Sequence, residues 1–164
     1  MSERMINEAL AAFRLPQYRE IPDVGLFLDQ TVKYLNGFLK DYPGMEMTGS
    51  MISNYVKQKI IPKAYKKTYS RDQISQLFFI AMAKSVLSMD QIRKALSIQE
   101  AACTSEERYE MFRTMMSEVL SSFEKGGTEN AAGEGRETKM IRYIVIAIAH
   151  KMYLDQYFEY GEAE

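Results

Sequence analysis

The residues best suited to hydrogen bonding with nucleic-acid bases gather near the middle of the chain, just before a run of lysines. Serine and asparagine both donate and accept hydrogen bonds, and asparagine can pair with adenine through two bonds at once. They fall on the early, polar side of a predicted helix at residues 48–59, and the early part of a recognition helix is what reaches base edges in the major groove. The base-reading candidates are Gly49, Ser50, Ser53 and Asn54.

A second group of residues in the same region is suited to contacting phosphates. Residues 47–96 hold nine basic and two acidic side chains, a net charge of +7, whereas the remainder holds 12 basic and 20 acidic ones. Positive charge gathered around a helix and turn is typical of polyanion binding, and phosphate contacts give affinity and register rather than sequence information. The competing interpretation is an ordinary solvated face. The phosphate-contact candidates are Tyr55, Lys57, Lys59, Lys63, Lys66, Lys67, Tyr69 and Arg71.

Catalytic and metal-binding patterns are weak by comparison. The single histidine, His150, lies in the most apolar predicted helix, and the single cysteine, Cys103, follows two alanines. The glycines of residues 126–135 lack the Lys-Ser/Thr of a phosphate-binding loop, and the glutamates of residues 106–118 have no histidine at the spacing of a di-metal bundle. We therefore expect no enzymatic activity, no catalytic residue, no metal site and no cofactor.

The composition fits a soluble protein of a reducing compartment. The chain has 164 residues, of which 46% are hydrophobic and 26% charged, so a core can form without disulfides. One cysteine excludes an internal disulfide. The first 15 residues lack the apolar stretch of a secretory signal, and the apolar run 144–149 is far short of the roughly 20 residues that span a membrane. We expect a cytoplasmic protein without membrane contact.

The spacing of apolar residues predicts the helices that would hold the candidate residues. Asp23, after a proline, predicts the start of a helix at residues 23–40, and Thr48 predicts the start of the next, which Pro62 ends. Ser70 and Ser88 each precede a glutamine by three residues, which is the capping-box pattern. Between the second and third helices, the basic segment 63–69 predicts a two-strand wing or a tight loop.

The second half of the chain predicts two further helices. An acidic helix is expected at residues 105–125, a flexible linker at 126–135, and a helix at 137–160 that is apolar around most of its circumference. Such a helix must be covered on several sides, either as the spine of the domain or as half of a dimer interface. We therefore expect a nearly all-α fold in two regions: a DNA-binding domain at residues 1–98 and a helical region for dimerisation or effector binding at 99–164.

From Thr48 to Leu96 the chain resembles the N-terminal DNA-binding module of MerR-type regulators. The resemblance lies in the cap at Thr48, the mid-helix Tyr55, the apolar pair 60–61 before Pro62, and Tyr69 at the end of the wing. It implies a winged helix-turn-helix that binds double-stranded DNA. The chain departs from that pattern at two places. Lys59 replaces the glycine before the apolar pair, and Tyr65-Lys66-Lys67 stand where the family has a Gly-Tyr-Arg wing step, which keeps a basic residue only in the last position. It also lacks an evident coiled-coil dimerisation helix.

A wider resemblance covers most of the chain. The segments LPQYREIPDVGLFLDQ, MISNYVKQKIIP and KKTYSRDQI are similar to a family of uncharacterised bacterial proteins catalogued as a domain of unknown function. That resemblance implies no activity of its own.

Together the patterns predict a MerR-like winged helix-turn-helix protein with a small β-wing and a C-terminal helical hairpin, acting as a bacterial transcriptional regulator. We expect it to bind double-stranded DNA as a homodimer, with a small-molecule effector as a further partner. Two alternatives remain open, both without DNA binding. One is a protein-interaction module that uses the apolar C-terminal helix. The other is a small-molecule sensor whose 12 methionines line a ligand cavity.

Overall fold

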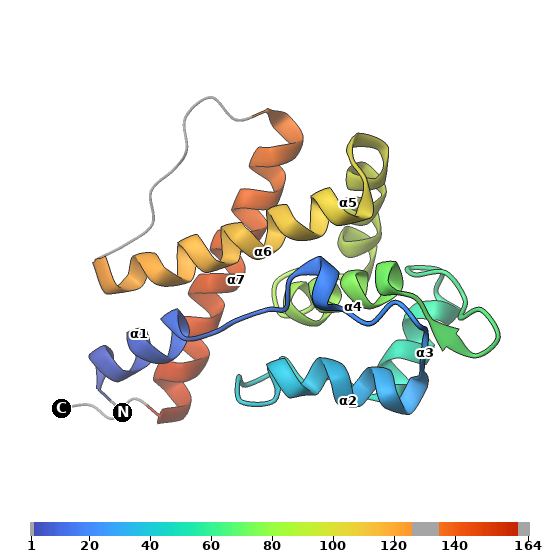
Figure 1. The fold of residues 1–164 in the computed structure, drawn as a ribbon. Coiled ribbons are helices and arrows are strands. Elements are labelled where there is room, and N and C mark those ends of the chain that lie inside the picture. The colour runs from blue at the N-terminus through green and yellow to red at the C-terminus, as the bar shows by residue number, and fades with distance from the viewer. Residues whose placement is uncertain (1, 126–134, 161–164) are drawn as a thin grey trace.

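The fold is nearly all α-helical, as predicted. The computed structural model describes residues 2–125 and 135–160 (Figure 1). The helices are α1 (Glu3–Ala11), α2 (Leu28–Leu39), α3 (Gly49–Lys57), α4 (Arg71–Ala83), α5 (Met89–Ala102), α6 (Ser105–Ser122) and α7 (Arg136–Tyr160). Strands β1 (Leu26–Phe27) and β2 (Thr68–Tyr69) form a small antiparallel sheet, and 3-10 turns lie at Tyr18–Glu20 and Phe123–Lys125.

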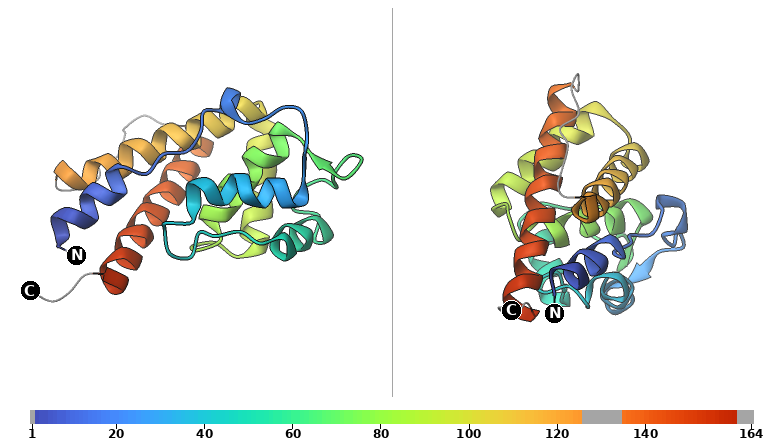
Figure 2. Two further views of the ribbon diagram at one scale, coloured as in Figure 1. Left: turned by 60° about the horizontal axis from the view of Figure 1, so that its bottom comes forward. Right: turned by 90° about the vertical axis from the view of Figure 1, so that its left-hand side faces the viewer.

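Helix α4 is the centre of the core. Every residue from Gln73 to Ala83 is buried, so this helix has no solvent-facing side along that stretch. Helices α2, α6 and α7 pack against α4, and α1 lies across α6 and α7 (Figures 1 and 2). One continuous hydrophobic cluster joins these helices. The two regions expected from the sequence, residues 1–98 and 99–164, therefore share one hydrophobic core.

The helix starts predicted at Thr48, Ser70 and Ser88 are confirmed. The hydroxyl of Thr48 accepts a hydrogen bond from the Met51 amide at 3.1 Å. Ser70 and Ser88 form the expected capping boxes. Thr104 caps α6 in the same way, accepting from the Glu107 amide at 3.2 Å. Each cap satisfies backbone N–H groups that the first turn of a helix leaves without partners.

One prediction about the N-terminal third is wrong, and one helix there was not predicted. Asp23 does not cap a helix, because residues 23–25 are not helical and lead into β1; α2 begins at Leu28, and the Gln30 side chain accepts a hydrogen bond from the Phe27 amide at 2.9 Å. Helix α1, capped by Ser2, was not anticipated. The predicted linker at 126–135 lies almost entirely outside the described residues.

Helix α7 is covered by its own chain on several sides. It packs against α1, α4, α5 and α6, which places it in the spine of the domain. Tyr143 and Leu154 remain exposed on its outer surface. The residues that it buries are Ile141, Ile144, Val145, Ile148, Ala149, Met152 and Gln156. None of the described helices is long and apolar enough to cross a bilayer.

Candidate nucleic-acid interface

The position of α3 at the edge of the molecule is set by its contacts with α2. The side chain of Asn36 on α2 binds both sides of the Met47 backbone: its amide donates to the carbonyl at 2.8 Å, and its oxygen accepts from the N–H at 2.9 Å. Gly49 begins α3 beside Leu28, where a Cβ atom would lie 3.4 Å from Leu28 Cδ2. Ile52 is fully buried beneath the helix. These contacts fix which face of α3 is turned to solvent.

The solvent-facing side of α3 carries the residues predicted to read bases. Ser50, Ser53 and Asn54 are exposed. Together with Gly49, Lys57 and Leu28 of the neighbouring helix, they line one shallow depression of the surface. Two serine hydroxyls, the Asn54 amide and the Lys57 ammonium are the polar side-chain groups of its lining. The structure therefore brings all four base-reading candidates together on one accessible face.

A tight turn with a lysine in the left-handed backbone region ends α3. Lys59 has φ of +58°, its N–H donates to the Val56 carbonyl at 3.0 Å, and the Ile60 N–H donates to the Tyr55 carbonyl at 2.9 Å. This pair of bonds is the Schellman motif, whose left-handed position is usually glycine. Arg93 of α5 donates a further bond to the Gln58 carbonyl at 3.0 Å and holds the turn against the core.

The basic segment after α3 forms a two-residue hairpin. Tyr65 and Thr68 exchange backbone hydrogen bonds of 3.0 and 2.9 Å, and between them Lys66 and Lys67 have φ of +49° and +66°. Two consecutive left-handed residues define a type I′ turn, for which Asn-Gly is the preferred sequence. The predicted wing is thus a short hairpin whose returning residues, Thr68 and Tyr69, pair with β1.

Interactions from the core hold this hairpin in place. The buried side chain of Gln73 donates to the carbonyls of Pro62 and Lys63, at 2.9 and 3.2 Å. Gly25 lies so close to Thr68 that a Cβ atom would come within 2.9 Å of its hydroxyl oxygen, and its φ of +83° favours glycine. The hairpin projects from the body of the molecule (Figure 2).

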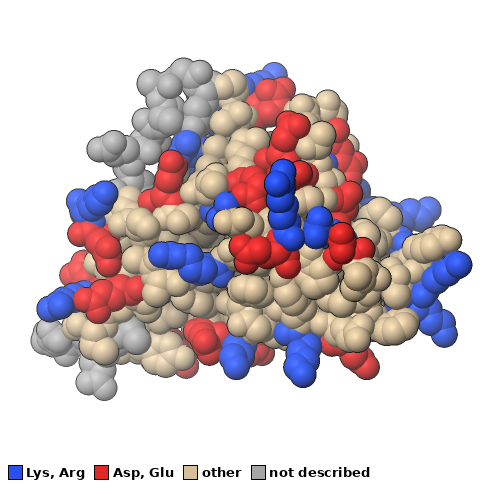
Figure 3. Space-filling view, viewed as in Figure 1, with Lys and Arg blue, Asp and Glu red and all other residues tan. Residues whose placement is uncertain are grey.

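The positive φ angles have a common feature. Within the residues that the structure describes, the non-glycine residues with a left-handed backbone are Lys59, Lys66 and Lys67. All three side chains are exposed, and none of them forms an ion pair with a described residue. Lys66 lies over the ring of the exposed Tyr65, 5.4 Å from its centre. Basic side chains gather at the end of the molecule that carries the hairpin (Figure 3).

Three phosphate-contact candidates are placed differently from the lysines. Tyr55 and Tyr69 belong to the hydrophobic core, with exposed fractions of 4% and 6%, and burial raises the pKa of both phenols. Arg71 donates to the carbonyls of Ile21 and Arg19, at 2.7 and 3.1 Å. The side chains of these three residues therefore pack or form hydrogen bonds within the protein and do not extend the exposed basic surface. Lys57 and Lys63 are exposed.

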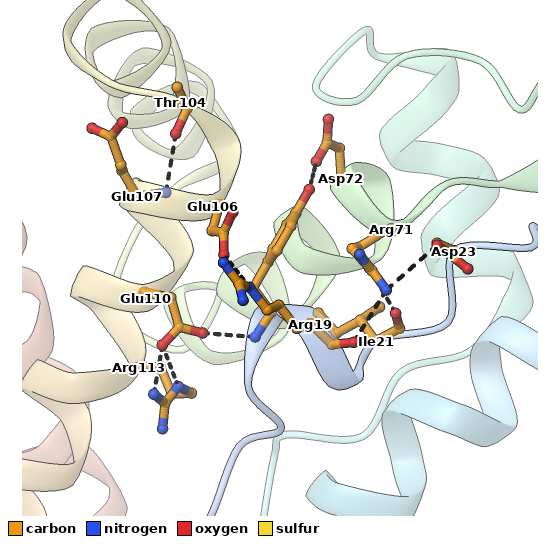
Figure 4. A network of polar contacts seen from close by, with 11 residues as sticks. Arg19, Ile21, Asp23, Arg71, Asp72, Thr104, Glu106, Glu107, Glu110 and Arg113 are labelled. Atoms are coloured by element: carbon orange, nitrogen blue, oxygen red, sulfur yellow. Dashed lines mark hydrogen bonds and ion pairs between the residues drawn. The ribbon is translucent and has the colours of Figure 1, made fainter.

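Arg71 is part of a network that fixes the segment before β1 to the helical core (Figure 4). Its guanidinium lies 3.7 Å from the Asp23 carboxylate and 5.4 Å from the centre of the Tyr18 ring. The Tyr18 hydroxyl donates to Asp72, and its backbone N–H donates to Glu110 at 2.6 Å. Partial burial, followed by the bond to Asp72, raises the pKa of Tyr18 to about 12. The network links the N-terminal segment to both α4 and α6.

Sequence reasoning missed the residues that position α3 and the hairpin. The hydrogen bonds of Asn36, of Arg93 and of Gln73 to the Pro62 and Lys63 carbonyls join segments far apart in the chain, so no local pattern reveals them.

His150 lies exposed with its Nδ1 2.7 Å from the Ile146 carbonyl oxygen. Over the described ranges 2–125 and 135–160, no group of three or more His, Cys, Asp or Glu side chains could hold a metal ion.

Comparison with known proteins yields one match. A family model described as Domain of unknown function (DUF1836) matches residues 16–125, which include α2, α3, the hairpin, α4, α5 and α6. No curated protein and no solved structure is significantly similar to the chain.

Proposed function

The chain belongs to the DUF1836 family, and we propose that it is a bacterial transcriptional regulator that binds double-stranded DNA through a MerR-like winged helix-turn-helix. In this proposal α3 enters the major groove, and the hairpin at residues 65–68 lies along the phosphate backbone. The order of a helix, a loop, a second helix and a hairpin supports the assignment.

The observation that carries the proposal is the backbone conformation of Lys59, Lys66 and Lys67. A left-handed conformation costs an L-residue about 1–2 kcal/mol, whereas glycine adopts it without a steric penalty. A protein under selection for stability alone would place glycine or asparagine at such turns. Conformational strain persists mainly where a site requires it. Exposed lysines at all three positions therefore favour a functional need for positive charge over an ordinary solvated surface.

The exposed face of α3 supports base reading. Ser50, Ser53 and Asn54 present hydroxyl and amide groups without a charged side chain among them, and such groups recognise base edges. Asn54 accepts one hydrogen bond, from Gln58 at 3.2 Å, which leaves its amide donors available. Lys57 lies at the end of the same face, where it would meet the phosphates that border the groove.

A homodimer is part of the proposal because two linked half-site contacts multiply the affinity for DNA. The exposed Tyr143 and Leu154 on the outer side of α7 provide apolar surface for such a contact. The proposed location is the cytoplasm, where the DNA of a bacterium lies.

The proposal is tested by duplex binding at low ionic strength. Fluorescence anisotropy with a labelled random-sequence duplex should show binding by the wild-type chain and a large loss for the double variant Lys66→Glu, Lys67→Glu. The control is the double variant Lys40→Glu, Lys125→Glu. It changes the net charge by the same amount as the test variant, but at exposed lysines that belong neither to α3 nor to the hairpin at residues 65–68. Equal losses for both double variants would show only a general charge effect. No binding by well-folded wild-type protein would reject the proposal.

A further inference from the structure

Two aromatic side chains of the small sheet are exposed to solvent. Phe27 of β1 is 55% exposed, and Tyr65 at the start of the hairpin is 74% exposed. Within residues 2–125 and 135–160, neither ring packs against another aromatic ring. Single exposed apolar residues are ordinary, but a group of them at one place marks a contact site.

The register of the sheet places the two rings on one face. Phe27 is paired with Thr68 in the antiparallel ladder, and Thr68 is paired with Tyr65 across the turn. Directly opposite residues of neighbouring antiparallel strands carry their side chains on the same face of the sheet. Because neighbouring strands lie about 4.8 Å apart, the Cα atoms of Phe27 and Tyr65 are separated by about 10 Å. Phe27, Thr68 and Tyr65 therefore form one row across the sheet, called here the aromatic row.

The middle of the aromatic row carries only small groups. Thr68 is half-buried, and its hydroxyl donates to the Tyr65 carbonyl at 2.8 Å. Gly25, which has no side chain, lies directly against Thr68. The two rings are therefore separated by a short side chain and a glycine, so each ring is open to a planar ligand.

Basic side chains border the aromatic row. The ammonium of Lys66 lies 5.4 Å from the centre of the Tyr65 ring. Lys63 and Lys67 line a groove that also contacts Phe27, with Asp29 as the acidic residue of its lining. The groove has a free volume of about 480 Å³, within the roughly 300–1,000 Å³ of small-ligand sites. At this end of the molecule, uncharged surface lies between basic side chains (Figure 3).

We propose that the aromatic row binds single-stranded DNA, with one unpaired base stacked on Phe27 and another on Tyr65. Proteins hold single strands by stacking bases on aromatic rings while basic side chains follow the phosphates. A duplex cannot use the rings in this way, because its bases are already stacked on one another. The choice of DNA rests on the proposed function, whereas base stacking rests on the sheet itself.

The lysines distinguish this surface from a site for another protein. Lysine is depleted in protein–protein interfaces, whereas aromatic rings among basic side chains are typical of surfaces that bind single strands. Lys63, Lys66 and Lys67 form no ion pair with a described residue, so their charges are available to phosphates.

The test is fluorescence anisotropy of the full chain with a labelled oligothymidylate at low salt. An abasic strand of the same length should bind more weakly, because it offers phosphates without bases. Phe27→Ala and Tyr65→Ala should each weaken oligothymidylate binding about 5- to 150-fold, the range expected for one stacked base. Tyr65→Phe should bind as the wild type does, because it keeps the ring. The matched control is Tyr160→Ala, which removes an exposed aromatic ring at the end of α7 and should not change binding.

The outcomes separate this inference from the proposed function. Wild-type protein that binds duplex but not oligothymidylate would overturn the inference alone, and protein that binds neither would overturn both. Equal affinity for the abasic strand, or undiminished binding by both alanine variants, would overturn base stacking. If Phe27→Ala does not fold, Phe27→Leu decides instead, because it keeps an apolar side chain and removes the ring. Tighter binding of an oligouridylate of the same length would overturn the assignment to DNA.

Discussion

Replacing the two hairpin lysines with the preferred turn sequence should stabilise the fold and weaken DNA binding at the same time. The double variant Lys66→Asn, Lys67→Gly places Asn-Gly in a turn whose φ angles are +49° and +66°. Asn-Gly is the sequence most favoured in type I′ turns. The substitution therefore removes conformational strain and two positive charges together, leaving the backbone hydrogen bonds between Tyr65 and Thr68 in place.

The expected gain in stability follows from the cost of the left-handed backbone. Each lysine pays about 1–2 kcal/mol at its position. Asparagine in this conformation keeps part of that steric penalty. Glycine avoids it but destabilises the folded state by about 0.5–1 kcal/mol, because its backbone loses more conformational freedom on folding. The net gain should be about 1–2 kcal/mol for the pair. For a chain of this size, each kcal/mol raises Tm by about 2–4 °C.

The expected loss of affinity follows from the release of counterions. Each phosphate contact contributes about 0.9 to the slope of log K against log salt concentration. Loss of two contacts should reduce that slope by about 1.8 and weaken duplex binding roughly 60-fold at about 0.1 M salt. Denaturant unfolding measures the first effect, and anisotropy titrations over a salt series measure the second.

The matched control is Lys63→Asn. Lys63 is an exposed lysine of the same basic segment, but its backbone is not left-handed. This variant should weaken binding without raising stability. A hairpin variant that is no more stable than wild type would refute the strain argument. A stabilised variant that binds duplex with unchanged affinity and salt dependence would refute the assignment of these lysines to phosphate contact.

Three further predictions concern single side chains. Asn54→Ala should change the preferred duplex sequence while leaving the affinity for random duplex within about threefold, because the amide reads bases rather than phosphates; competition assays with variant sites measure this. The pKa of Tyr18, raised from 10.0 to about 12 by burial and the bond to Asp72, means that the unfolded chain loses this proton first as pH rises. The protonated Tyr18 hydroxyl therefore contributes its full share of the unfolding free energy below pH 10.0, and this share disappears towards about pH 12. The unfolding free energy of Tyr18→Phe, measured with urea, should decline less than that of the wild type over this range. Gly25→Ala should cost about 1–3 kcal/mol, visible as a lower denaturant midpoint, because the added Cβ meets Thr68 in a left-handed position.

Local chemistry explains why some of the structure could be predicted. Each cap at Thr48, Ser70 and Ser88 is a hydrogen bond between a side chain and the amide three residues later. A few neighbouring residues are therefore enough to predict it. The polar face of α3 follows from helical spacing for the same reason. Prediction fails at β1, because residues 26–27 become a strand only through pairing with residues 68–69, more than 40 positions later.

Side-chain roles were harder to predict than helix positions. Tyr55, Tyr69 and Arg71 have side chains of the right type for phosphates, but their burial and their partners depend on packing between distant segments. Arg108 stands in an acidic stretch of sequence, yet the packing of α6 against the core leaves it only 8% exposed. Residue type indicates what a side chain can do, and tertiary packing decides whether it is accessible.

Selection of bound sequences from a pool of random duplexes tests the central claim most directly. The account predicts that the wild-type chain enriches duplexes sharing a short recurrent motif, and that Asn54→Ala shifts that motif. Retention of duplex without any recurrent motif would contradict base reading by α3. A folded protein that retains no duplex even at low salt would contradict DNA binding altogether.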